Sequence, residues 1–193
     1  GEGSNKWEAY LPIIEKPNLF NPEIGYISTA NQNVTPGDYN KWEAIGFDWA
    51  DPYRGNRINK VLESKEKFNL KEMLALQVDY YSIPSEQIIN LSSGLISNNM
   101  EYFSMLEKWD KKLSKSSIEA GIYIEWQNQL FLEVNKKFVP EKVNKYIEMQ
   151  LFKVIEKISE MNINEKKELL NKTFNSSIDN LKEKFGENPN NWV

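Results

Sequence analysis

The sequence predicts a mainly α-helical fold, a bundle of about six helices preceded by an extended or β segment. From Arg54 to about Phe185, apolar residues recur at the three-to-four-residue spacing of amphipathic helices. Before Arg54, Gly and Pro interrupt the chain, and one β-type run stands alone from Gly25 to Ala30. We therefore predict two unlike parts: residues 1–53 form an extended arm, a strand and an aromatic loop, and residues 54–193 form a helical domain.

Residues 1–20 are predicted to form an extended arm, because Gly1, Gly3, Pro12 and Pro17 prevent a long helix. The arm carries several apolar side chains that need a surface to cover them: Trp7, Tyr10, Leu11, Ile13 and Ile14. We expect such an arm to dock on a neighbouring body.

The predicted strand, Gly25 to Ala30, ends in an amide cluster formed by Asn31, Gln32 and Asn33. An aromatic loop follows and leads to Arg54; its large side chains are Trp42, Phe47, Trp49 and Tyr53. A lone strand leaves its backbone groups unsatisfied, so we expect its partners on chain outside this sequence. The amide cluster and the Arg54 guanidinium could share a pocket.

The helices are predicted at residues 54–65, 70–81, 84–95, 100–113, 116–138, 140–158 and 164–185. Asn69 and Asn164 are the expected N-caps of two of them, and Pro84 suits a first helical turn. Gly186 and Pro189 are expected to stop the last helix.

The composition excludes several classes of function. A net charge of −4 and a pI near 5.2 argue against a nucleic-acid partner, and no apolar run approaches the ~20 residues of a membrane span. The chain has neither cysteine nor histidine, which excludes disulfides, thiolate metal sites and triads that use histidine. If the protein is a hydrolase, its base must be another group, such as the free α-amino group of an N-terminal nucleophile.

Some of these residues form a pattern that resembles the middle of the large chain of the penicillin acylase (penicillin amidase) family of N-terminal-nucleophile hydrolases. The densest matches are Asn21-Pro22, Gly25-Tyr26-Ile27, Asn31, Trp49, Tyr53-Arg54 and Arg57-Ile58. Others are Gly1-Glu2-Gly3 with Trp7 and Leu11-Pro12, and Leu76-Gln77-Val78-Asp79 with Ser82. Weaker ones are Trp109-Asp110 and Asn188-Pro189 with Trp192.

The resemblance implies an internal fragment of an αββα enzyme that hydrolyses linear amides, of the β-lactam side-chain or N-acyl-homoserine lactone type. The nucleophile is expected to be a serine upstream of Gly1, freed by self-cleavage; Ser4 does not match it, so this chain alone should be inactive. The implied partners are the rest of the large chain, the small chain and a small-molecule amide. Many relatives are exported.

Two residues match functional positions of the family. The asparagine that follows the Gly-Tyr-Ile strand donates its amide to the oxyanion, and Asn31 is in its place. Arg54 matches the arginine that orients the active site. From the residues alone, Asn31 would more simply end a strand by bonding its own backbone, and Arg54 could equally pair with Asp51 or Glu63 at the surface. Gln32 stands where many relatives have a second asparagine, and we assign it no role.

Three further features are interpreted structurally. The family often binds calcium, and Glu43 falls near one ligand position, but a lone exposed glutamate is usually just solvated, so no metal is assigned. The polar cluster of Gln77, Asp79 and Ser82 is expected to satisfy loop backbone. Trp109 and Trp126 are expected in the core. The alternative to an enzyme is a helical scaffolding or binding module, or a relative that has lost catalysis.

Overall fold

The computed structural model describes residues 3–4, 6 and 9–192, and it divides the chain into two compact units, residues 1–64 and 65–193. The predictions for Gly1, Glu2 and Trp7 fall outside the described residues. Helix α1, Tyr53–Leu62, belongs to the first unit. The predicted division into residues 1–53, an arm, strand and aromatic loop, and residues 54–193, a helical domain, concerns the domains of the whole protein and stays a prediction.

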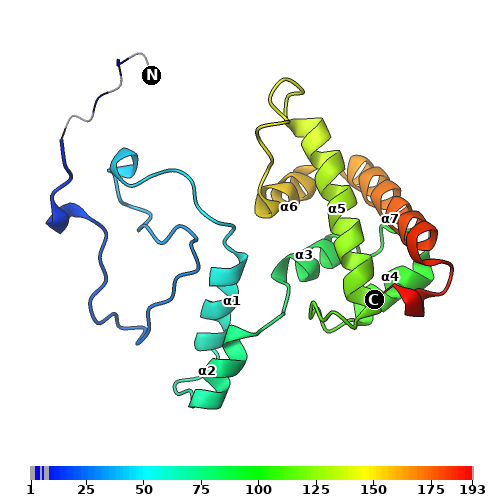
Figure 1. The fold of residues 1–193 in the computed structure, drawn as a ribbon, viewed down its shortest axis with the longest axis horizontal. Coiled ribbons are helices and arrows are strands. Elements are labelled where there is room, and N and C mark those ends of the chain that lie inside the picture. The colour runs from blue at the N-terminus through cyan, green and yellow to red at the C-terminus, as the bar shows by residue number, and fades with distance from the viewer. Residues whose placement is uncertain (1–2, 5, 7–8, 193) are drawn as a thin grey trace. The chain divides into compact units, whose positions relative to one another are not determined.

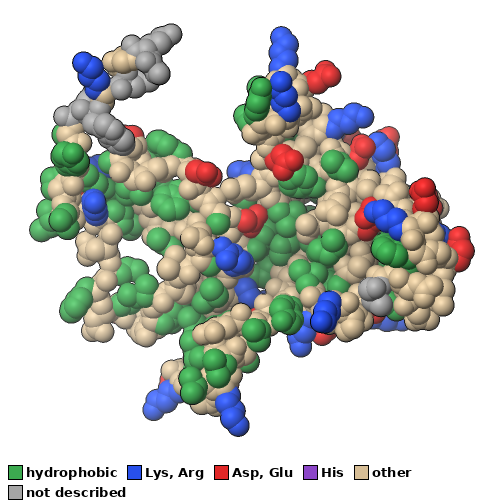
Figure 2. Space-filling view, in the orientation of Figure 1, with side chains coloured by type: hydrophobic (Ala, Val, Ile, Leu, Met, Phe, Trp, Pro, Cys, Tyr) green, Lys and Arg blue, Asp and Glu red, His purple; other side chains and the backbone are tan. Residues whose placement is uncertain are grey.

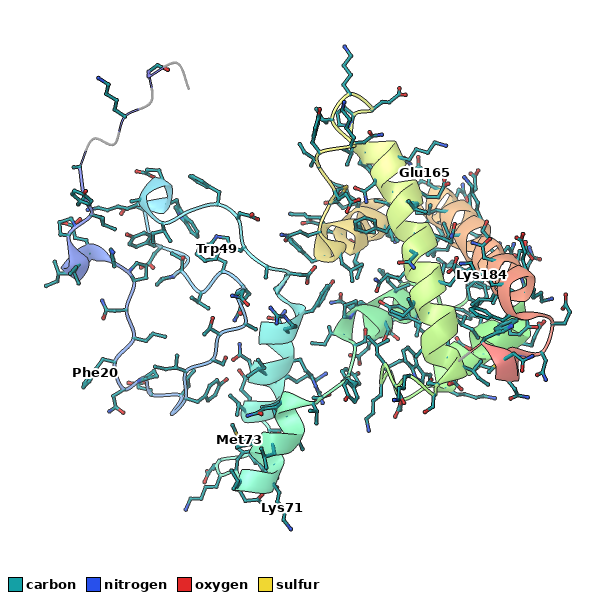
Figure 3. The ribbon with its side chains drawn as sticks, in the orientation of Figure 1. Phe20, Trp49, Lys71, Met73, Glu165 and Lys184 are labelled. Atoms are coloured by element: carbon teal, nitrogen blue, oxygen red, sulfur yellow. The ribbon has the colours of Figure 1, made fainter. Side chains whose placement is uncertain are left out.

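The first unit is mostly turns and extended chain around α1 (Figure 1). Two short 3₁₀ helices interrupt it, η1 at Ile13–Glu15 and η2 at Trp42–Ala44. Several apolar side chains are uncovered within this unit, among them Tyr10 at 99% and Phe20 at 94% exposure, and Phe20 projects from its loop (Figure 3). In the space-filling view, hydrophobic side chains accordingly reach the surface of this part of the chain (Figure 2).

The predicted strand from Gly25 to Ala30 forms no ladder with another described segment; its partners were expected outside this sequence, so its assignment as a strand stays a prediction. The β-type alternation is nevertheless present: Tyr26, Ser28 and Ala30 are half-buried, whereas Ile27 and Thr29 are exposed. A β-type sequence supplies the side-chain alternation, but a strand also needs a backbone partner. This segment lies instead against a helix.

Side chains of this extended segment contact α1 in reverse order. The Tyr26 hydroxyl donates a hydrogen bond to Glu63 Oε1 at 3.1 Å, and the Ser28 hydroxyl donates to Asn59 Oδ1. Further along the segment, the Gln32 side chain lies against Gly55. The extended segment and α1 therefore run antiparallel, and α1 fixes the position of the residues that follow Ala30.

The second unit is a helical bundle. Its elements are α2 (Leu70–Gln77), α3 (Ile83–Ser92), α4 (Met100–Lys108), α5 (Ile118–Phe138), α6 (Leu151–Glu160), α7 (Ile163–Phe185) and η3 (Pro189–Asn191). The two longest helices, α5 and α7, lie side by side and make the most extensive contact between helices (Figure 1). The prediction of a mainly helical fold is thus confirmed. Among the described residues, no helix is long and apolar enough to cross a membrane.

An aromatic cluster lies at the centre of this bundle. Trp126 on α5 and Phe174 on α7 are fully buried, with ring centroids 4.9 Å apart, and Phe103 of α4 packs edge-on against both. The Trp126 indole N–H donates to Thr173 Oγ1 at 3.1 Å, so its polar atom is satisfied. Trp109 is also buried. The expectation that both tryptophans belong to the core is confirmed.

Polar contacts join α5 and α7 beside the core. Glu125 of α5 accepts hydrogen bonds from Asn180 at 2.8 Å and from Lys184 at 3.2 Å, both on α7. Burial alone would raise the pKa of Glu125, but these hydrogen bonds outweigh it and lower the pKa. Near the start of α7, Glu165 pairs with Lys137 of α5 at 3.5 Å, so the labelled Glu165 and Lys184 mark the two ends of this contact (Figure 3).

The predicted helix at residues 140–158 is wrong in its first half, since residues 141–146 form turns, residues 147–150 have no regular structure and α6 begins at Leu151. Tyr146 and Ile147 are exposed, so these apolar side chains have no core to stabilise a helical turn. The Met149 N–H donates to the Asn135 side chain at 2.8 Å, which holds the turns against α5. Only from Val154 onward does the apolar face become buried.

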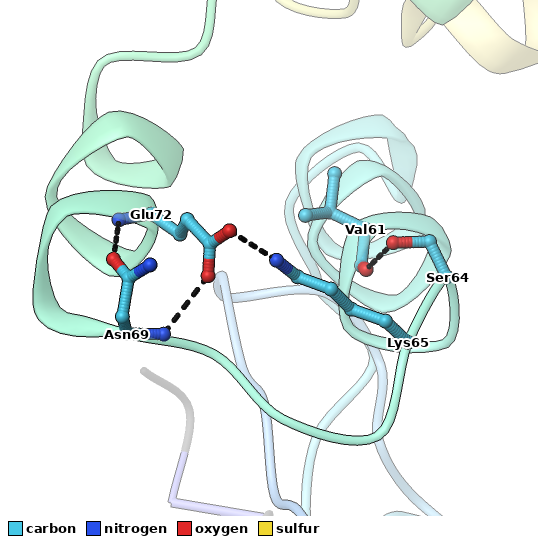
Figure 4. Close-up of polar contacts among 5 residues, drawn as sticks. All are labelled: Val61, Ser64, Lys65, Asn69 and Glu72. Carbon is cyan, nitrogen blue, oxygen red and sulfur yellow. Dashed lines mark hydrogen bonds and ion pairs between the residues drawn. The ribbon is translucent and has the colours of Figure 1, made fainter.

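Local sequence signals set several helix ends. Asn69 caps α2 through a capping box, in which its side chain accepts from the Glu72 N–H at 3.1 Å and Glu72 accepts from the Asn69 N–H at 2.9 Å (Figure 4). Lys65 pairs with the same carboxylate (Figure 4). Pro84 lies in the first turn of α3, and Gly186 ends α7 with φ +86°. The cap of α7 is Asn162 rather than Asn164.

Two members of the predicted polar cluster, Asp79 and Ser82, act on the backbone as expected, whereas Gln77 is the exposed last residue of α2. Asp79 accepts from the Tyr81 N–H at 2.8 Å, and Ser82 caps α3 by accepting from the Ser85 N–H at 3.2 Å.

The Asn69 cap predicts a measurable effect on stability. Asn69→Ala should lower the free energy of unfolding of α2 by about 1 kcal/mol, because it removes the acceptor of the Glu72 N–H. Hydrogen exchange of the α2 amides measures this change. Asn69→Asp is the matched control, since a carboxylate keeps the acceptor; equal loss in both variants would contradict the capping role.

Candidate functional site

The candidate site is the turn that follows the extended segment. Asn31 lies there with φ +65°, a left-handed conformation that asparagine tolerates better than most residues. Its backbone carbonyl accepts a hydrogen bond from the Ala50 N–H at 2.9 Å, which ties the turn to the aromatic loop. The Asn31 side chain is exposed, so a bound molecule could reach it.

Arg54, in the first turn of α1, brings the second predicted residue to this turn. Its Nη2 atom donates to the Ala30 carbonyl at 2.9 Å and to Asn31 Oδ1 at 3.1 Å. The guanidinium therefore binds the carbonyl half of the Asn31 amide, which leaves the NH₂ half as the donor. The Arg54 side chain is exposed.

Gln32, to which the sequence analysis assigned no role, is the buried residue of the three amides. It is 8% exposed, and its Oε1 atom accepts from the Ala30 N–H at 2.6 Å. Asn33, the third amide, is exposed and accepts from the Thr35 N–H at 2.9 Å. The three successive amides thus have different surroundings. One signal in the sequence could have pointed to this contact: Gly55 lies inside a predicted helix, where glycine is a poor helix former, and its bare backbone is what the Gln32 side chain packs against.

The aromatic loop adds a half-buried tyrosine, Tyr53, next to Arg54 in the chain. Burial raises the pKa of Tyr53 above its ordinary value, and the negative charge of Asp51 raises it further. This phenol therefore stays protonated. Asp51 also accepts from the Tyr53 N–H at 3.2 Å, at the start of α1.

A pocket of about 350 Å³ opens elsewhere in this unit; its lining residues are Leu11, Lys16, Pro17, Val34, Thr35, Ala44, Ile45 and Trp49.

The side chains present do not form a metal site by themselves. Glu43 is exposed in η2, and no three His, Cys, Asp or Glu side chains come together among the residues that the structure describes.

Comparisons with known proteins place this chain in a family. A family model described as penicillin amidase matches residues 1–193. Acyl-homoserine lactone acylase QuiP of Pseudomonas fluorescens (strain Pf0-1) is 29% identical over 153 residues, covering 70% of this chain and 18% of that protein. Penicillin G acylase of Escherichia coli is 28% identical over 123 residues, covering 57% of this chain and 14% of that protein.

A solved structure extends the likeness to the fold. A thermostable penicillin G acylase from Alcaligenes faecalis matches with a TM-score of 0.74 at 15% identity, over 100% of this chain and 42% of that chain. The chain spans less than a fifth of the length of the curated relatives. Because the family model covers every residue and the fold agrees, the chain belongs to the penicillin amidase family.

Proposed function

We propose that the protein containing this chain is an amidohydrolase that cleaves a linear amide through an acyl-enzyme. The observation that carries the proposal is the pairing of Arg54 with Asn31 Oδ1 at 3.1 Å, which leaves the Asn31 NH₂ group as an exposed donor. Family membership supports the hydrolase class, since the named relatives are acylases.

In the proposed reaction, a serine at the N-terminus of the large chain, outside this sequence, attacks the amide carbonyl. Its hydroxyl proton passes through water to its own α-amino group and then to the leaving amine. The carbonyl oxygen becomes an oxyanion, and the Asn31 NH₂ group donates a hydrogen bond to it. Water then hydrolyses the ester, which releases the acid. Arg54 keeps the Asn31 amide in the donating orientation.

The proposed substrate is an N-acyl compound, either an N-acyl-homoserine lactone or a β-lactam with an acylated amine. The names of the relatives, acyl-homoserine lactone acylase and penicillin G acylase, support both. The proposed partners are the rest of the large chain and the small chain. Apolar side chains such as Phe20 and Ile14 are exposed in this chain, which supports covering by another part of the enzyme.

Intact-mass analysis of the product of the complete gene tests the proposal. We expect two chains, the larger beginning with serine, and hydrolysis of at least one amide in a panel that contains penicillin G and N-acyl-homoserine lactones. A single uncleaved chain without amidase activity would instead favour the scaffolding alternative. This chain expressed alone is expected to be inactive on the same panel.

A further inference from the structure

We propose that Gln32, seated against the bare backbone of Gly55, is a positioning residue that holds Asn31 in its donating orientation. The inference rests on the proposed function, because it takes Asn31 to be the oxyanion donor. It assigns a role to Gln32, a member of the amide cluster to which the sequence analysis assigned none.

The contacts of Gln32 reach across the Asn31 turn. Its Oε1 atom accepts from the Ala30 N–H at 2.6 Å, so one hydrogen bond joins the residues on either side of Asn31. Arg54 binds the Ala30 carbonyl at 2.9 Å as well as the Asn31 side chain, and Ala50 binds the Asn31 carbonyl. Gln32 is the buried member of this set, at 8% exposure. Its side chain therefore supports the turn from the protein side, while Asn31 stays accessible.

Gly55 makes room for this arrangement. A β-carbon at position 55 would lie 2.4 Å from both Cδ and Nε2 of Gln32 and 2.8 Å from Oε1, which is closer than real β-carbons approach other atoms. Gly55 lies within α1, where its backbone is helical, and alanine is the better helix former there. The helical backbone at position 55 does not require glycine. The closeness of the Gln32 amide does, because it leaves no room for a β-carbon.

The position of the donor matters more for catalysis than for folding. A misplacement of about 1 Å at a catalytic group can reduce the rate by roughly 100-fold. If the Gln32 amide is displaced, the Ala30 N–H loses its acceptor and the turn that carries Asn31 is free to shift. Gln32 therefore acts on the reaction through Asn31, without contacting substrate.

Two substitutions in the complete, processed protein test this from opposite sides: Gln32→Ala removes the amide, and Gly55→Ala pushes it away. With phenylacetyl or dodecanoyl 4-nitroanilide as the probe, we expect each to lower kcat by roughly 10- to 100-fold with KM changed less than about twofold. The double variant should be no slower than Gln32→Ala alone, because alanine at 55 then has nothing to displace. Asn56→Ala, at an exposed position of the same helix, is the matched control and should keep wild-type kinetics.

A cycle with Asn31→Gly separates positioning from a general structural effect. In the Asn31→Gly background, Gln32→Ala should have no further effect on kcat. The inference is overturned if Gln32→Ala reduces kcat by the same factor with and without the Asn31 amide, or if Gly55→Ala keeps wild-type kcat.

A wild type that hydrolyses neither probe would count against the proposed function, and the positioning role then depends on a structural measurement. A crystal structure of the Gly55→Ala protein with Asn31 and Arg54 in unchanged contact would overturn the inference. A displaced Gln32 amide with a shifted Asn31 turn would support it.

Discussion

Asn31→Gly in the complete protein is expected to lower kcat by roughly 100- to 1000-fold and to leave KM nearly unchanged. A neutral donor aimed at the oxyanion contributes about 3–4 kcal/mol to the transition state, and glycine removes it. Glycine is the appropriate replacement because Asn31 has φ +65°, which glycine adopts freely and alanine does not. Steady-state kinetics on the best amide of the panel measure the effect.

The matched control for this variant is Asn33→Gly. Asn33 is an exposed amide two residues further along, and its described hydrogen bond is the local one from the Thr35 N–H. It should keep kcat within about threefold of wild type, because its amide is not aimed at the reacting carbonyl. Self-cleavage into two chains should proceed in both variants. Wild-type kcat in Asn31→Gly would remove Asn31 from the oxyanion role.

Phe174→Ala should produce the largest loss of stability. Phe174 is fully buried and contacts the rings of Trp126 and Phe103, so truncation leaves a cavity in the middle of the bundle. The expected cost is about 3–5 kcal/mol. Hydrogen exchange of the α5 and α7 amides in the complete protein reports the change as a lower free energy of opening.

Phe185→Ala provides the comparison on the same helix. Phe185 is 49% exposed at the end of α7, so its truncation should cost less than about 1 kcal/mol. If both variants lower protection in α5 and α7 equally, the aromatic cluster is not the centre of stability that its burial indicates.

The helical unit could be predicted because its signals are local. The apolar spacing of α5 and α7 indicates which face is buried, and Asn69 and Gly186 set helix ends through groups within a few residues. Residues 140–150 could not be predicted in the same way, since Tyr146 and Ile147 match the helical period but stay exposed. Periodicity shows that a face is apolar; it does not show that a core lies opposite.

The two candidate residues of the site could be predicted from the sequence, but the contacts that hold them in place could not. Asn31 and Arg54 were identified by resemblance, and the structure brings them within hydrogen-bond distance; their catalytic roles remain proposals. The contact depends on the extended segment running along α1, from Tyr26 beside Glu63 to Gln32 beside Gly55. Such pairings join residues 23 to 37 positions apart, and no local pattern in the sequence encodes them.

The close contact between Gln32 and Gly55 also constrains how this site could have evolved. An ancestor with a β-carbon at position 55 could not have accepted glutamine at 32 in its present seat, because the two would collide. Gln32 in its present position therefore needs glycine at 55, whereas glycine at 55 does not need glutamine at 32. Replacing the glycine alone would push the Gln32 side chain out of this position, so the effects of substitutions at the two sites should not be independent.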